Sequence, residues 1–409
     1  MSQTWIVPGL RTPLAKSGGA LRAMDAIALS VPVVQAMIEQ LGGAVPDFAV
    51  WGTVMPNLTW SNIAREVLLD AGVGSWVPAF STVMACSTSM IAAIEAAGML
   101  DDRGRSLALV GGAESLSRVQ IALSQNMSDW LRSVLQAKGL RGKLGAAASV
   151  RPSTLGLFIP SVANRTTGKS MGEHMELTVA QLGGPSREAQ DRLAFESHRH
   201  AVEAWERRFF DDLVIPVAGV TRDTLPRHDT SLEKLAKLPP AFDRRNGTIT
   251  AGNASPLTDG AASVWVATTA GLERLPSALP RVQLVDWEIA AVDIREEGLL
   301  MAPVYAIPKL LERHGLRYED IQLWEIHEAF AAQVLAHIQV LETKSLGPFP
   351  RERVNPNGGT IALGHPFGAT GARIMSQAAK ELAARGSGAR AIVSICADGG
   401  EGTVMLLQA

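Results

Sequence analysis

The sequence predicts an α/β fold built from two related halves. Apolar runs, such as SLALVGG (106–112) and AIVSICA (391–397), alternate with Ala-rich stretches of helical periodicity. A reactive residue followed by a helix, a strand and a glycine turn occurs after Cys86 and again after His365, which indicates an internal duplication. The 409 residues, 47% of them hydrophobic, suffice for more than one domain and a large core.

The chain begins with a predicted strand, TWIVPGLRTP (4–13), directly after Met-Ser-Gln. This leaves no room for a secretory signal, and no apolar span of roughly 18 residues follows. The only two cysteines, Cys86 and Cys396, suggest a reducing compartment, and a disulfide between them is not expected because it would destroy the site described below. We expect a soluble, cytoplasmic protein.

Cys86 lies in FSTVMACSTSMIAAIEAAGML (80–100), where an apolar run ends at the cysteine and an Ala-rich helical pattern begins. A thiol at the start of a helix faces unpaired N–H groups, which favour an anion and would lower its pKa. We therefore expect a reactive thiolate. The competing interpretation is a small buried apolar residue.

Cys396 lies in RAIVSICADGGEGTVMLLQA (390–409), which predicts two strands joined by a glycine-rich bend close to the thiol. The glycines allow a substrate to approach the main chain closely, although a plain turn would also explain them.

Two histidines complete the set of candidate groups. His365 lies among five glycines in NPNGGTIALGHPFGATGARIM (355–375), which predicts a base on an open turn. His327 ends a predicted strand in IQLWEIHEAFAAQVLAH (321–337), where a capping or core histidine is the alternative.

These motifs resemble the thiolase family over essentially the whole chain. The similar segments, in order, are VPGLRTPLAKSGGAL, VMACSTSM, GGAESLS, MGEH, SREAQDRLAFESHRHA, DTSLEKLAKLPPAF, TAGNASPLTDGAA, HEAFA, GHPFGATGAR and CADGGEG. Met-Ala-Cys, the His of HEAFA, Pro-Phe in GHPFGATG and the long segment between Ser117 and Met171 resemble the β-subunit of trifunctional fatty-acid β-oxidation complexes.

The resemblance implies a duplicated thiolase fold with five layers, α-β-α-β-α, in which two five-stranded sheets sandwich helices. Residues 1–116 plus 252–280 would form the N-terminal half and residues 281–409 the C-terminal half. Residues 117–251 would form an inserted loop domain that covers the coenzyme A (CoA) site.

The implied activity is that of a 3-oxoacyl-CoA thiolase, which cleaves 3-oxoacyl-CoA with CoA to acetyl-CoA and a shortened acyl-CoA in fatty-acid β-oxidation. By resemblance, Cys86 becomes acylated and His365 takes its proton. Cys396 protonates the leaving enolate of acetyl-CoA and activates the incoming CoA thiol. CoA is a substrate; no cofactor and no metal are expected.

The resemblance also implies two oxyanion sites. His365, with a water held at His327, would bind one thioester oxygen, and the main-chain N–H groups of Cys86 and Asp398 would bind the other. The family commonly has glycine at position 398. A carboxylate beside a developing oxyanion is unfavourable, so we expect Asp398 either to face solvent or to slow the enzyme.

Four side chains are expected to contact substrate. Ser255 matches a position at the pantetheine arm and Phe242 a wall of the CoA tunnel, while Met171 and Phe330 would line the acyl end. For each, an ordinary turn or core residue is the alternative. Basic residues of the inserted segment are candidates for the CoA phosphates.

The expected partners are acyl-CoA and CoA, a second copy in a homodimer or larger homo-oligomer, and a hydratase/dehydrogenase subunit. Nucleic acid is not expected at a net charge of −2. The stretch 129–160 mixes apolar residues with one acid and five basic residues, Arg132, Lys138, Arg141, Lys143 and Arg151. A solvated loop is the main interpretation, and a surface that meets a membrane or partner subunit is the alternative.

Three other functions compete with this one. A biosynthetic acetoacetyl-CoA thiolase would use the same groups in reverse. Another Claisen-condensing enzyme, of the ketoacyl-synthase type, would use a cysteine and two histidines, and the second thiol argues against it. An inactive acyl-CoA-binding subunit would have lost at least one of the four groups. The acyl chain length and the physiological direction are not encoded in these motifs.

Overall fold

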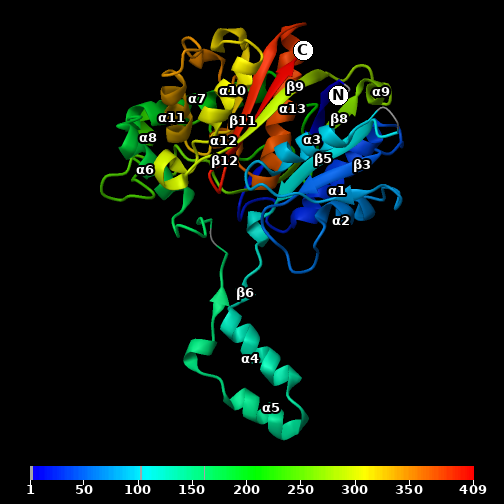
Figure 1. Ribbon diagram of the computed structural model, residues 1–409, viewed down its shortest axis with the longest axis vertical. Coiled ribbons are helices and arrows are strands. Elements are labelled where there is room, and N and C mark those ends of the chain that lie inside the picture. The colour runs from blue at the N-terminus through cyan, green and yellow to red at the C-terminus, as the bar shows by residue number, and fades with distance from the viewer. Residues whose placement is uncertain (1–2, 102–103, 161) are drawn as a thin grey trace.

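The structure is a computed structural model that describes residues 3–101, 104–160 and 162–409 (Figure 1). Its strands form one ten-stranded sheet with two halves and a separate two-stranded sheet. The N-terminal half has the order β1 (Thr4–Arg11), β8 (Thr258–Thr268), β5 (Leu107–Glu114), β3 (Phe48–Gly52) and β4 (Ala79–Phe80), with β2 (Ala15–Lys16) beside β8. The C-terminal half has the order β9 (Val282–Ala291), β12 (Glu401–Gln408), β11 (Arg390–Ala397) and β10 (Leu323–Ile326).

Antiparallel pairing of β1 with β9 joins the two halves. The expectation of five strands in each half is met in the N-terminal half. In the C-terminal half the fifth position holds a single parallel bridge between Trp324 and Val354. The 3-10 helix Arg351–Arg353 directly before Val354 turns the chain, so only one residue can pair there.

Two helices pack between the halves of the sheet and form the central layer. They are α3 (Thr88–Met99) and α13 (Thr370–Arg385), which contact each other and strands of both halves. The helices approach closely because Gly371 has no side chain: a Cβ there would lie 2.4 Å from the main-chain nitrogen of Met90. This layer holds the elements that follow both Cys86 and His365.

The outer helices cover the other face of each half. They are α1 (Ala26–Gln40) and α2 (Ile63–Asp70) on the N-terminal half, and α10 (Pro303–Arg313) and α11 (Ala331–Leu341) on the C-terminal half. The Asp25 side chain caps α1 by accepting the N–H of Ala28 at 2.8 Å. The result is the five-layered arrangement that the sequence predicts.

The inserted segment divides into two parts (Figure 1). The first is an arm that stands away from the body and contains β6 (Ala122–Leu123), α4 (Gln125–Gln136), α5 (Gly139–Ala148) and β7 (Leu157–Phe158), with β6 paired to β7. The second packs on the C-terminal half through α6 (Met171–Leu182) and α7 (Arg187–Glu206), which contact α11, and continues to α8 (Leu232–Ala236).

The remaining helices are short. They are α9 (Thr269–Leu272), α12 (Thr360–Leu363), a π-helix at Ile294–Gly298 and 3-10 helices at Leu116–Arg118, Pro152–Thr154, Tyr318–Asp320, Arg351–Arg353 and Phe367–Ala369. Within the described residues, every helix is too short or too polar to cross a bilayer.

Candidate active site

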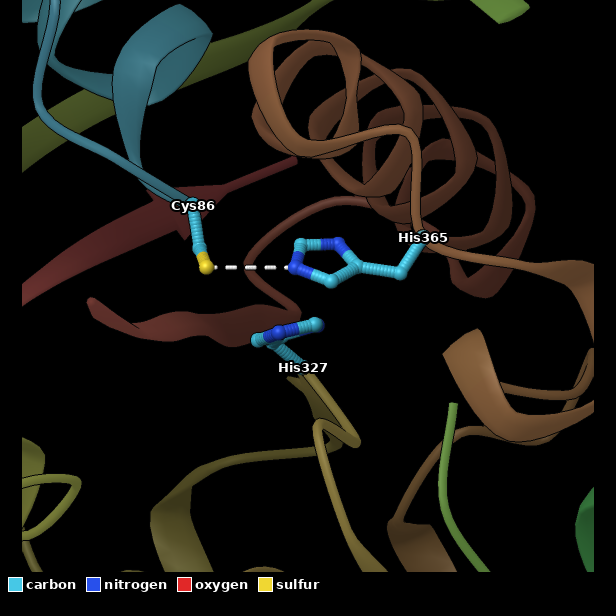
Figure 2. A group of neighbouring side chains, drawn as sticks. All are labelled: Cys86, His327 and His365. Atoms are coloured by element: carbon cyan, nitrogen blue, oxygen red, sulfur yellow. Dashed lines mark hydrogen bonds between the residues drawn. The ribbon is translucent and has the colours of Figure 1, made fainter. Parts of the chain in front are cut away.

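Cys86 lies on a sharp turn between β4 and the start of α3. The preceding residue, Ala85, has φ of 44°, a left-handed conformation that is strained for a residue with a side chain. Strain of this kind is found where a turn must present one side chain in a fixed direction. Here it directs the Cys86 thiol toward two imidazole rings (Figure 2).

His365 is placed to act as a base toward Cys86. Its Nε2 atom lies 3.1 Å from Cys86 Sγ, and its Nδ1 atom lies 2.7 Å from the Thr370 hydroxyl (Figure 2). The Thr370 hydroxyl donates to the Pro366 carbonyl at 3.2 Å, so it accepts from Nδ1–H. This assigns the proton to Nδ1 and leaves the Nε2 lone pair facing the thiol.

His327 faces the same point with an unpaired nitrogen. Its ring centre lies 4.2 Å from that of His365, and its Nδ1 atom lies 3.0 Å from the Thr360 hydroxyl. That hydroxyl accepts the N–H of Glu328 at 2.7 Å, and among the described contacts its own proton has only His327 Nδ1 as acceptor. His327 Nε2 is then a buried N–H without a protein partner, ready to donate to a water or a substrate oxygen.

Cys396 is the last but one residue of β11 and is 1% exposed. It lies opposite Gly402 across the hairpin of β11 and β12. Both cysteines are free thiols, as the sequence predicts. Burial raises the pKa of Cys396 well above its usual value, and a charge on Cys86 raises this pKa further.

The expectation of a lowered thiol pKa at Cys86 is wrong for the free enzyme. Burial raises the pKa of Cys86 to about 12, and the Asp398 carboxylate adds to this increase. Burial also lowers the pKa of His365 to about 3 and that of His327 well below its usual range. The resting pair is therefore a neutral thiol and a neutral imidazole, because the cost of desolvating charge exceeds the effect of the helix start.

The main-chain N–H groups of Asp398 and Cys86, expected at one oxyanion site, both lower the pKa of the Cys86 thiol and so partly offset the effect of its burial. Their place at an oxyanion site stays a prediction. We expected Asp398 either to face solvent or to slow the enzyme. Its side chain is half-buried, and its Oδ1 atom accepts from Asn164 Nδ2 at 2.8 Å, so it faces solvent only in part, and its effect on the rate stays a prediction.

A cavity of about 490 Å³ lies next to this centre. Its wall includes Leu257, which forms a bridge with His365, and the predicted substrate residues Phe242 and Ser255. Two exposed cations, Lys16 and Arg227, also line it.

Met171 and Phe330 do not line this cavity. Phe330 is buried and meets Phe242 edge to face with 5.7 Å between the ring centres, and Met171 packs against the same core. Phe330 thus lies behind Phe242 of the cavity wall, and the contact of Met171 and Phe330 with the acyl end stays a prediction.

Sequence reasoning missed the residues that orient the histidines. Thr370 and Thr360 fix the two rings, and the Thr258 hydroxyl accepts the main-chain N–H of His365 at 3.0 Å. Glu114 joins the end of β5 to the His365 loop by accepting the N–H groups of Val54 at 3.0 Å and of Gly368 at 3.2 Å. The hydroxyls of Thr360 and Thr370, inside the glycine-rich motif, were the sequence signal that could have identified such residues.

Two family models match the chain: the thiolase N-terminal domain over residues 4–270 and the thiolase C-terminal domain over residues 278–409. The chain belongs to the thiolase family. The 3-ketoacyl-CoA thiolase of Pectobacterium carotovorum is 35% identical over 98% of this thiolase and 95% of its own length. The 3-ketoacyl-CoA thiolase of Erwinia tasmaniensis is 36% identical over 98% of this chain and 96% of its own length.

Solved structures agree with this thiolase over the whole chain. Acat5 thiolase from Ascaris suum, in complex with coenzyme A, has a TM-score of 0.83 at 28% identity and covers 99% of both chains. The acetyl-CoA acetyltransferase of Bacillus anthracis has a TM-score of 0.83 at 32% identity and covers 100% of this chain and 99% of its own. The predicted fold and family are confirmed.

The thiolase centre also contains a potential metal-ligand set. Ligand atoms of Cys86, His327 and His365 lie within 4.8 Å of one another. A cysteine and two histidines suit a Zn²⁺ ion, but such an ion would occupy the sulfur and nitrogen lone pairs that proton transfer requires.

Proposed function

We propose that this thiolase is an acyltransferase that cleaves 3-oxoacyl-CoA with CoA, through an acyl group on Cys86, in fatty-acid β-oxidation. The observation that carries the proposal is the arrangement around one sulfur atom. His365 Nε2 lies 3.1 Å from it, and the main-chain N–H groups of Cys86 and Asp398 favour negative charge on it. A base and an oxyanion site thus meet at a single nucleophile.

In the first half of the reaction, the Cys86 sulfur attacks the 3-oxo carbon and its proton passes to His365 Nε2. The N–H groups of Cys86 and Asp398 stabilise the oxyanion that forms. The bond between C2 and C3 then breaks, and its electron pair leaves as the enolate of acetyl-CoA. Protonated His365 and a water held by His327 bind the enolate oxygen, and the Cys396 thiol gives its proton to C2.

In the second half, the Cys396 thiolate takes the proton of the CoA thiol, and the CoA sulfur attacks the acyl group on Cys86. The thioester bond to Cys86 breaks, and its sulfur recovers the proton from His365. Every proton and oxyanion is thereby assigned to a group of this chain. We propose that the reaction uses CoA as a substrate and requires no metal or cofactor.

The cavity of about 490 Å³ suits the pantetheine arm and nucleotide of CoA, with Ser255 and Phe242 in its wall and the cations at its rim. Replacing Arg227 with alanine is expected to raise the KM for CoA about 3- to 10-fold with little change in kcat, because an exposed cation contributes about 1 kcal/mol to binding a phosphate. Lys237, exposed on the same segment but outside the cavity, is the matched control. Equal KM values for Arg227→Ala, Lys237→Ala and the unmodified enzyme would remove Arg227 from the CoA site.

The function is tested by following CoA-dependent cleavage of 3-oxoacyl-CoA substrates from four to sixteen carbons. Cleavage of the longer substrates supports the β-oxidation assignment. Activity confined to acetoacetyl-CoA would contradict it. That outcome would favour the second candidate, a biosynthetic acetoacetyl-CoA thiolase, which the similarity to the Bacillus anthracis acetyl-CoA acetyltransferase supports.

The exposed side chains of the arm support the proposal that it contacts an anionic membrane surface. Large apolar side chains are exposed along it, with Leu135 76% and Leu140 75% exposed. It carries five basic residues, and its single acid, Asp129, is paired with Arg132. Apolar side chains interleaved with cations match the interface of a bilayer rich in anionic lipid.

We expect the enzyme to sediment with phosphatidylglycerol vesicles at low salt and not with phosphatidylcholine vesicles. Lys138→Glu with Arg141→Glu should abolish this binding, whereas Arg385→Glu, a change of the same sign on the body, should not. The contact would be ruled out if the arm variant and the Arg385→Glu variant sedimented equally, or if the unmodified enzyme did not sediment with the vesicles at all.

A homodimer or larger homo-oligomer is supported by the edge of the sheet at β4. Exposed apolar side chains, Trp76 and Val83, flank this short edge strand, and strands of a second copy could cover it. The two free cysteines support a cytoplasmic location. A hydratase/dehydrogenase partner subunit is proposed from the β-oxidation assignment.

A further inference from the structure

The Asp398 carboxylate is anchored by a residue of the inserted segment. Asn164 Nδ2 donates to Asp398 Oδ1 at 2.8 Å, and the main-chain N–H of Gly399 donates to the same oxygen at 2.7 Å. Asn164 is 7% exposed, so little water competes for the contact. The two residues are 234 positions apart in the chain.

The orientation of the Asn164 amide follows from its other contacts. Its oxygen accepts the main-chain N–H groups of Thr166 and Thr167, each at 3.1 Å, and lies 3.3 Å from the Thr167 hydroxyl. That hydroxyl lies 2.7 Å from His174 Nε2. Because the amide oxygen is occupied by its own turn, only the NH₂ group is left to face Asp398.

Asp398 carries two groups with opposite effects on the nucleophile. Its main-chain N–H favours negative charge on the Cys86 sulfur, and its carboxylate opposes it. Glu114 is a second, weaker source of opposing charge. The balance at Asp398 depends on the direction in which its side chain is held, since the repulsion between two charges grows as their separation falls.

We propose that Asn164 is a positioning residue that fixes the direction of the Asp398 carboxylate and keeps it from turning closer to the oxyanion site, where the main-chain N–H of Asp398 faces the reacting oxygen. The identity of that oxygen rests on the proposed function. The contact makes the inserted segment part of the catalytic arrangement and explains how a carboxylate is tolerated at position 398.

The test combines steady-state kinetics with the pH dependence of Cys86 alkylation by iodoacetamide. Asn164→Ala frees the carboxylate to turn toward the site. It should lower kcat about 10- to 100-fold, the range for a weakened oxyanion site, with less than about a threefold change in KM. It should also move the alkylation profile to higher pH, because a nearer carboxylate disfavours the thiolate.

Removing the carboxylate should make Asn164 dispensable. In an Asp398→Ala background, alkylation at a given pH should be faster, and adding Asn164→Ala should change neither kcat nor the alkylation profile. Asn164→Asp should be more damaging than Asn164→Ala, because it places two carboxylates together. Combining Asn164→Asp with Asp398→Asn should restore activity, because the carboxylate at position 398 and the repulsion between two carboxylates are both removed.

Thr167→Val is the control for the turn itself, since it removes the hydroxyl contact to Asn164 without touching Asp398. If Asn164→Ala lowers kcat equally with and without the Asp398 carboxylate, or leaves kcat and the alkylation profile unchanged, the proposal is overturned. The alkylation readout needs no substrate turnover. A failure of this proposal is therefore distinguishable from a failure of the proposed thiolase reaction.

Discussion

Replacing Cys86 with alanine is expected to abolish 3-oxoacyl-CoA cleavage, with a fall in kcat of about 10⁴-fold or more. The chain has no second sulfur in contact with His365 Nε2 among its described residues, so no other group can form the acyl-enzyme. Losing a covalent nucleophile from such a pair typically costs this much. The measurement is steady-state thiolysis with a saturating 3-oxoacyl-CoA substrate.

The control for Cys86→Ala is substrate binding. The CoA cavity is lined by other residues, so the Kd for a non-hydrolysable acyl-CoA analogue should change less than about threefold. A variant that binds the analogue normally and still cleaves at more than about 1% of the original rate would contradict the nucleophile assignment.

Cys396→Ala is expected to separate the two chemistries of the site. Cleavage requires a proton at C2, and general acid–base groups contribute about 10² to 10⁴-fold, so kcat for thiolysis should fall by that factor. Exchange of an acyl group between a saturated acyl-CoA and labelled CoA involves no carbon acid. In that exchange the variant loses only the help of Cys396 in deprotonating the CoA thiol, which ionises far more readily than a carbon acid. The exchange should therefore be slowed less than thiolysis, because Cys86 and His365 remain in contact.

Equal losses in both assays would contradict this separation. A packing role is a genuine competitor because Cys396 is 1% exposed and belongs to the core of the C-terminal half. Cys396→Ser is the matched variant: it preserves the size and replaces only the acid. It should resemble Cys396→Ala in thiolysis and the unmodified enzyme in thermal unfolding.

Local sequence patterns predicted the fold class and the residues to examine. Cys86 at a strand-to-helix turn and His365 on a glycine-rich loop were readable because the turn chemistry lies within about ten residues of each. The internal duplication placed them shortly before equivalent helices, α3 and α13. The structure brings both residues to one centre together with His327.

Long-range properties could not be predicted in the same way. The thiol pKa expected from the helix start was wrong because burial at Cys86 is set by tertiary packing, and its effect is the larger one. The contact between Asn164 and Asp398 joins distant segments, and the sequence around neither residue has a pattern that predicts it. The arm was recognisable as basic and apolar, but its extension away from the body is a property of the whole fold (Figure 1).

In the proposed reaction one sulfur, that of Cys86, carries the acyl group during turnover. The direct measurement is intact-mass spectrometry of the enzyme quenched in acid within seconds of mixing with 3-oxohexadecanoyl-CoA in the absence of free CoA, followed by peptide mapping. We predict a mass increase equal to the fourteen-carbon acyl group on the peptide containing Cys86, which disappears when CoA is added. An acyl group on Cys396 instead, or acetyl-CoA release without any acylated enzyme, would contradict the account.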